Sequence, residues 1–161
     1  MADLDLIRDF VNTADLEEGR DELERWLEDN HGRSGDAVQA RAVREALREL
    51  LRANNGVGAD LAAPSEILDA AARKLGLRVR FHDGSIKLMA RAGDDVGALA
   101  LVLAAVADAM ADGSWIRLKA CRSDTCRWAF VDNARNRSRH WCDMSVCGNR
   151  QKVRTFRSQH P

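Results

Sequence analysis

Two short stretches decide the organisation of this chain: CRSDTC, residues 121–126, and CDMSVC, residues 142–147. Each stretch begins and ends with a cysteine, fifteen residues separate the two, and together they hold all four cysteines of the chain. Tetrahedral ligation by four thiolates is typical of structural zinc sites and leaves no coordination position open for catalysis. The predicted ligands of one structural zinc ion are Cys121, Cys126, Cys142 and Cys147.

Other states of these cysteines stay open at this point. Two disulfides are one alternative, although clustered cysteines in a reducing compartment more often bind metal. A zinc site whose thiolates are switched by oxidation is another. His140, two residues before Cys142, could also replace one thiolate, but four thiolates already complete the ligand set.

The cysteine-bearing segment is too short to bury much apolar surface by itself. We therefore expect the metal to supply much of its folding free energy. The side chains expected to pack around the metal are Trp128, Phe130, Trp141 and Val146. Stacking on nucleic-acid bases is the alternative role of the aromatic side chains, because they lie among arginines.

The net charge of zero hides two regions of opposite sign. Residues 1–114 carry 14 Lys+Arg and 22 Asp+Glu, a net charge of −8. Residues 115–161 carry 11 Lys+Arg and 3 Asp+Glu, a net charge of +8. A basic region suits a polyanionic partner, whereas an acidic region is repelled by one. The two regions are therefore expected to have different tasks.

The basic region has an arginine-rich loop, residues 133–140, and an expected helix that begins near Cys147. On that helix three arginines follow the spacing of one face, while Lys152 lies off it. Arginine binds phosphate oxygens and guanine edges, so we predict nucleic-acid binding. The alternative is that these cations dock on the acidic region or are solvated. The predicted contacts are Arg135, Arg137, Arg139, Arg150, Lys152, Arg154 and Arg157.

Residues 1–114 are predicted to form a mostly helical domain with one small β-hairpin. Apolar residues at helical spacing predict helices at 4–11, 23–30, 37–53, 64–75 and 96–110. In the fourth helix Ile67, Leu68, Ala71 and Leu75 are expected inside, and the fifth is expected to be buried on most sides.

The hairpin is predicted from alternating residues 77–81, which should have one buried face, a turn at Asp83-Gly84 and a return at 85–90. Residues 115–120 should form a strand that leads into the first cysteine pair. The expected fold class is α+β. A mostly helical domain, residues 1–114, is followed by a small zinc finger with four cysteine ligands, residues 115–161, with the boundary near Gly113–Lys119.

Several functions are not expected. The longest apolar stretch, residues 99–110, contains Asp108 and is too short to cross a bilayer, and the acidic N-terminus lacks the order of a secretion signal. We therefore expect a cytoplasmic protein without membrane association. No nucleophile–base motif indicates an enzyme, and the isolated histidines have no assigned partner. The acidic pairs Glu17-Glu18 and Asp94-Asp95 are expected to be solvated or to cap helices.

The cysteine region resembles a known family over about forty residues. The runs CRSDTCRWAFVD at 121–132, RHWCDM at 139–144 and CGNRQK at 147–152 resemble the CGNR zinc finger, which is named after the tetrapeptide at 147–150. One departure is Asn133, where a serine is expected after the aspartate. Upstream, DFVNT at 9–13 is similar to the opening motif of the ABATE domain, which typically precedes this finger.

The resemblance implies a bacterial stress-induced transcription regulator with zinc on the four cysteines. The N-terminal domain would sense a small-molecule effector or a partner, and the finger would bind DNA. A homodimer is an option, because one finger makes few base contacts. The alternative is a zinc-stapled protein-interaction adaptor that binds no nucleic acid. A third hypothesis, an enzyme with a site between the N-terminal helices, has no motif to support it.

Overall fold

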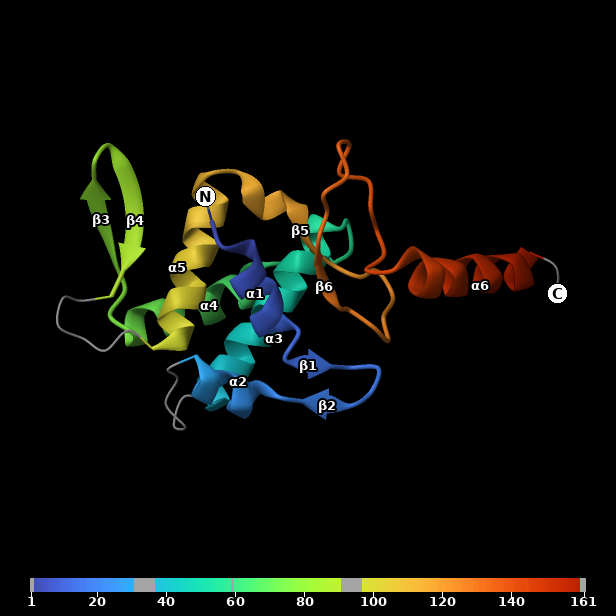
Figure 1. The fold of residues 1–161 in the computed structure, drawn as a ribbon, viewed down its shortest axis with the longest axis horizontal. Helices are drawn as coiled ribbons and strands as arrows, with labels where there is room; N and C mark the ends of the chain where they lie inside the picture. Colours follow the sequence, from blue (N-terminus) through green and yellow to red (C-terminus); the bar gives the residue numbers. More distant parts are fainter. Residues whose placement is uncertain (1, 31–36, 59, 91–96, 160–161) are drawn as a thin grey trace.

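The computed structural model describes residues 2–30, 37–58, 60–90 and 97–159 (Figure 1). The helices are α1 (Leu4–Val11), α2 (Leu23–Asp29), α3 (Ala37–Asn54), α4 (Ala62–Lys74), α5 (Ala98–Ala111) and α6 (Asn149–Gln159). A 3-10 turn, η2 (Ser114–Arg117), follows α5, and a π-helical turn, η3 (Met144–Gly148), precedes α6. The strands of these residues form antiparallel pairs: β1 (Ala14–Asp15) with β2 (Arg20–Asp21), β3 (Arg78–His82) with β4 (Ser85–Met89), and β5 (Leu118–Ala120) with β6 (Ala129–Val131).

This architecture confirms the α+β prediction of a mostly helical chain with small hairpins and a C-terminal cysteine region. The predicted helices all occur, with ends shifted by a few residues. In the described part of the chain, no helix is long and apolar enough to cross a bilayer. The acidic pair Asp94-Asp95 and the isolated histidines His31 and His160 lie outside the described residues, as does the side chain of His82.

The core lies between α1, α3 and α5. Phe10 of α1 and Val102 of α5 are fully buried, and so are Val43 and Leu47 on the apolar stripe of α3. The Phe10 and Trp26 rings pack with their centroids 5.2 Å apart, which attaches α2 to this core. The apolar periodicity of these helices therefore predicts their buried faces correctly.

The β5–β6 pair belongs to the same core. Leu118, Ala120 and Ala129 are buried in one apolar cluster with residues of α1, α3 and α5. Figure 1 shows β5 and β6 beside α1 and α3, between the helical body and the C-terminal helix. The chain therefore crosses the predicted boundary at Gly113–Lys119 without leaving the core. The division into 1–114 and 115–161 stays a prediction.

The β3–β4 hairpin differs from its prediction. Its register pairs Val79 with Leu88 and Phe81 with Ile86, as expected of a hairpin with its turn at Asp83-Gly84. The expectation of one buried face is wrong, because Phe81 is 83% exposed and Val79 and Ile86 are more than half exposed. Ile67 of α4 is also exposed, against its prediction. Alternation predicts a strand with two different faces, but a face is buried only if another element packs against it. Of the paired residues Val79, Leu88, Phe81 and Ile86, Leu88 is the one that is partly buried.

Two local elements were not predicted correctly. Residues 115–117 form a 3-10 turn instead of a strand, because Gly113 adopts φ +77° and the Asp112 carboxylate accepts the Ser114 amide. The β1–β2 hairpin was missed because two-residue strands carry no periodic signal. Its turn is held by Asp15, whose carboxylate accepts the amides of Glu17 and Glu18.

Candidate metal centre and nucleic-acid interface

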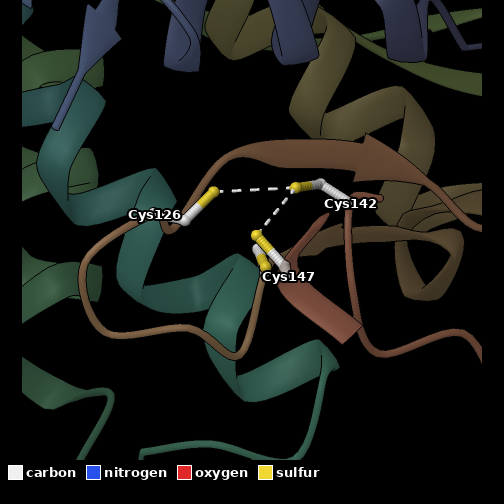
Figure 2. A group of neighbouring side chains, drawn as sticks. Cys126, Cys142 and Cys147 are labelled. Atoms are coloured by element: carbon white, nitrogen blue, oxygen red, sulfur yellow. Dashed lines mark hydrogen bonds between the residues drawn. The ribbon is translucent and has the colours of Figure 1, made fainter. Parts of the chain in front are cut away.

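The four cysteines meet in space. All four Sγ atoms lie within 4.8 Å of one another, and none is in a disulfide. Figure 2 shows the Cys142 sulfur joined by dashed lines to those of Cys126 and Cys147, at Sγ–Sγ distances of 3.6 and 3.8 Å. A tetrahedral ion with metal–sulfur bonds of about 2.3 Å would hold its sulfur atoms about 3.8 Å apart. The spacing of the thiols therefore fits a zinc-sized ion.

The electrostatics of this group favour a bound cation. Hydrogen bonds from Cys126 and Cys142 lower the pKa of Cys121 to about 2. Hydrogen bonding to Cys121 raises the pKa of Cys126 to about 12 and raises that of Cys142, and burial raises the pKa of Cys147. The thiols thus stabilise one thiolate and disfavour the others. A divalent cation removes that penalty, because it stabilises all four thiolates at once.

Each cysteine pair is shaped by its own turn. In the first, the Cys121 amide donates to the Trp128 carbonyl over 2.9 Å, and Arg127 reverses the chain with φ +51°. In the second, the Asp143 carboxylate accepts the amides of Ser145 and Val146. Each turn brings its two thiols to the same side, so that one ion can bind both pairs.

The Met144 side chain packs closely against Gly148, the residue directly after Cys147. A Cβ atom there would lie 2.5 Å from the Met144 sulfur, which is closer than van der Waals contact allows. A larger residue at 148 would therefore require the flexible Met144 side chain to move.

The large side chains of the segment divide into three groups. Trp128 and Trp141 pack on the cysteines, as predicted. Phe130 is buried, but it packs elsewhere and carries the Arg139 guanidinium 4.9 Å from its ring centroid. The expectation for Val146 is wrong: its side chain is exposed, because η3 directs it outward from the cysteines.

His140 lies outside the group of thiols. Its Nδ1 is 3.0 Å from the Asn55 side-chain oxygen, and burial lowers its pKa. Among the described residues, the group able to hold a metal consists of the four cysteines alone.

Polar residues of α3 and of the turn directly after it tie the cysteine segment to the helical body. Asn55 donates to the carbonyls of Ala120 and His140 over 2.8 and 2.9 Å. Arg48, which is 1% exposed, donates to the carbonyls of Arg127 and Val11. Sequence reasoning missed both residues. Their signal was a second stripe on α3 at helical spacing, namely Arg44, Arg48, Arg52 and Asn55.

A buried ion pair lies beneath the arginine-rich loop and was also missed. Lys119 of β5 and Asp132, directly after β6, are 2.7 Å apart, with side chains 4% and 0% exposed. Burial opposes ionisation of Asp132, but bonds from Lys119 and from the amides of Ala134 and Arg139 outweigh it, so its pKa is lowered. No sequence pattern marks this pair, because alternation in a strand predicts that a lysine between Leu118 and Ala120 faces solvent, whereas all three residues of β5 are buried.

The predicted nucleic-acid contacts fall into two groups. The Arg139 guanidinium is bound within the chain: it donates to the carbonyls of Trp141 and Cys142. Arg150 pairs with Glu17 of the β1–β2 turn, so Glu17 is not simply solvated as expected. The other five side chains are exposed and have no partner among the residues that the structure describes: Arg135, Arg137, Lys152, Arg154 and Arg157.

These five cations lie on two segments. Arg135 and Arg137 are in the loop that follows β6. The helix α6 projects away from the helical body (Figure 1). Arg150, Arg154 and Arg157 line one surface hollow on α6 together with Val146 and Val153, which confirms that they share a face.

Comparison with known families identifies both parts of the chain. The CGNR zinc finger model matches residues 117–160. The ABATE model, described as "putative stress-induced transcription regulator", matches residues 4–113. The chain belongs to the ABATE family. A search of curated proteins found no match.

The ABATE motif at residues 9–13 has a structural explanation. Asn12 donates to the Ala129 carbonyl and accepts the Ala129 amide, at 2.9 and 2.8 Å. Thr13 accepts a hydrogen bond from Arg44 of α3. The motif of the ABATE domain therefore contacts strand β6 of the CGNR zinc finger, and the two matched regions share an interface in this structure.

Proposed function

We propose that this protein is a DNA-binding transcription regulator whose basic surface is ordered by one zinc ion. The proposed ligands are Cys121, Cys126, Cys142 and Cys147. Zinc would supply charge neutralisation of the four thiolates and a fixed connection between the two cysteine turns. The spacing of the sulfur atoms and the family of the chain support this role.

The observation that carries DNA binding is the set of five exposed cations without partners. Cations that dock on their own chain are paired here, as Arg127 is with Glu49 and Arg52 with Asp124. Arg135, Arg137 and the cations of α6 beyond Arg150 have no such partner among the described residues. A phosphate backbone is the polyanion that such a surface suits, since guanidinium groups bind phosphate oxygens in pairs.

The N-terminal domain is proposed to sense a small, largely apolar effector. A hollow of about 290 Å³ lies between α4, α5 and β4. Its apolar lining includes Leu68, Leu88, Leu103, Val106 and Met110. Ligand sites are usually apolar hollows of this kind with few polar groups.

The test combines metal analysis with binding. One zinc per chain is expected on the purified protein, and its complete absence would contradict the zinc assignment. Fluorescence anisotropy with a short labelled duplex should show binding whose affinity falls steeply as KCl rises. Binding that does not depend on salt would overturn the proposed surface. A homodimer would bind two half-sites, and sedimentation of the complex would report its stoichiometry.

A protein-interaction adaptor is the second candidate, and one observation favours it. Val79, Phe81 and Ile86 form an exposed apolar face on the β3–β4 hairpin, as protein contacts require. Retention of neither duplex, single strand nor RNA in a gel shift at low salt would favour the adaptor over the regulator.

A further inference from the structure

The arginine-rich loop is held from below by buried side chains. The Lys119 ammonium donates to the Asp132 carboxylate over 2.7 Å and to the carbonyls of Arg137 and Arg139 over 2.5 and 3.2 Å. Asp132 accepts the amides of Ala134 and Arg139, each over 3.0 Å. One ion pair thus holds the backbone at both ends of the loop.

Arg117 reinforces the first end of the loop. Its guanidinium donates to the carbonyls of Asp132 and Ala134 over 3.0 and 3.3 Å. No side-chain partner among the described residues holds Arg135 or Arg137 itself. The loop backbone is therefore fixed while its two exposed guanidinium groups stay available.

The backbone of Arg137 is unusual. Its φ is +51°, a left-handed conformation that costs a residue with a Cβ free energy and that glycine or asparagine adopts more readily. Its carbonyl is the one that Lys119 binds most closely. An arginine in such a position indicates that its side chain has a use that glycine could not supply.

A contribution to stability alone does not explain the pair. Burying two charges costs desolvation free energy, and apolar residues of similar size often replace buried ion pairs without loss of stability. What an apolar pair cannot do is donate to the Arg137 and Arg139 carbonyls and accept the Ala134 and Arg139 amides. The specific consequence of this ion pair is the shape of the loop.

We propose that Lys119 and Asp132 are positioning residues that hold loop 133–139 in the conformation in which Arg135 and Arg137 bind the phosphates of DNA. The assignment rests on the proposed DNA binding. The ion pair itself touches no nucleic acid, and it acts through the backbone that it fixes. The loop then loses little conformational entropy when it binds.

The test is the double variant Lys119→Met/Asp132→Leu in the zinc-loaded full chain. It removes one charge of each sign, so the net charge and the long-range attraction for DNA are unchanged. Because no unpaired buried ion remains, the variant should keep its zinc and its melting temperature. The single variant Asp132→Asn serves as comparison, since it leaves the Lys119 charge buried and should be less stable.

Three readouts are compared with the parent: affinity for a short labelled duplex, the slope of log affinity against log KCl, and the rate of tryptic cleavage after Arg135 and Arg137. We expect the affinity to fall about tenfold and tryptic cleavage to accelerate. The magnitude of the salt slope should fall by the equivalent of about one to two phosphate contacts. The cleavage rate does not require DNA.

The outcomes separate the two proposals. A folded, zinc-loaded double variant with the affinity, slope and cleavage rate of the parent would overturn the positioning role. A double variant that loses zinc and unfolds would also overturn it, because the pair would then support the whole fold. If the parent itself binds no DNA, the proposed function fails, and faster cleavage in the variant would still show that the pair orders the loop.

Discussion

The two basic segments, loop 133–139 and helix α6, carry the same kind of charge but are held in different ways. Lys119, Asp132 and Arg117 fix the loop through its backbone. The helix follows the second cysteine turn, and the exposed pair of Arg150 with Glu17 links its side chains to the helical body. Segments with the same sign of charge can therefore differ in how firmly their backbone is held. We expect each arginine of the loop to contribute more to DNA affinity than each arginine of α6.

The largest expected effect comes from breaking what both segments share. Cys126→Ser, or zinc removal with a chelator, should abolish DNA binding, because metal binding supplies on the order of 10 kcal/mol in small zinc modules. Helical structure should also be lost in the helical body, because Leu118, Ala120 and Ala129 of β5 and β6 are part of its apolar core. Zinc content, circular dichroism and anisotropy report these changes. Thr125→Ser, between Cys121 and Cys126, is the control. Full DNA binding by the metal-free protein would contradict the proposal that zinc orders the basic surface.

The next effect tests the connection to the helical body. Asn55→Ala removes the side-chain donor to the Ala120 and His140 carbonyls, and the His140 carbonyl keeps the Arg122 amide as a donor. We expect unfolding in urea to require about 1–3 kcal/mol less free energy, because the buried Ala120 carbonyl loses its side-chain donor and the His140 carbonyl loses one of its two donors. Asn136→Ala, on the exposed loop, is the matched control. Equal midpoints for the two variants would show that the contact of Asn55 is dispensable.

A smaller effect compares the segments directly. Arg137→Gln and Arg154→Gln each remove one exposed positive charge that has no partner among the described residues. Each should reduce the salt slope by about 0.9, the value for one phosphate contact. We expect the loss of affinity to be several-fold larger for Arg137, because its backbone is already fixed. A larger loss for Arg154, measured by anisotropy under the same conditions, would reverse the ranking of loop and helix.

The smallest effect concerns Arg150. Glu17→Gln should free this arginine and raise DNA affinity by about two- to threefold, since an exposed ion pair contributes at most about 1 kcal/mol. Glu18→Gln removes the same charge from the same turn, but no hydrogen bond or ion pair of the Glu18 side chain is found among the described residues. Its increase should be smaller. Identical increases for both variants would mean that overall charge, and not the ion pair, limits binding.

Much of the fold could be predicted from the sequence because it follows local periodicity. The apolar spacing of α1, α3 and α5 predicts their buried faces, and Asp83-Gly84 predicts a hairpin turn. Burial of the hairpin could not be predicted, since it depends on what packs against Val79 and Phe81. The thiol group followed from spacing, whereas the ion pair joins Lys119 on β5 to Asp132, thirteen positions later and directly after β6.

The sequence by itself determined the family of the chain, its helices, its charge asymmetry and the four cysteines that could gather at one point. Spacing and composition encode these features, because they depend on neighbours in the chain. Only the tertiary structure decided which cations are bound by other groups of the chain, as Arg139 and Arg150 are, and which stay available. It also decided that β5–β6 joins the helical core through Asn12, Arg48 and Asn55. Hydrogen bonds between distant residues form only when packing brings a donor within about 3 Å of an acceptor, and no local pattern records that distance.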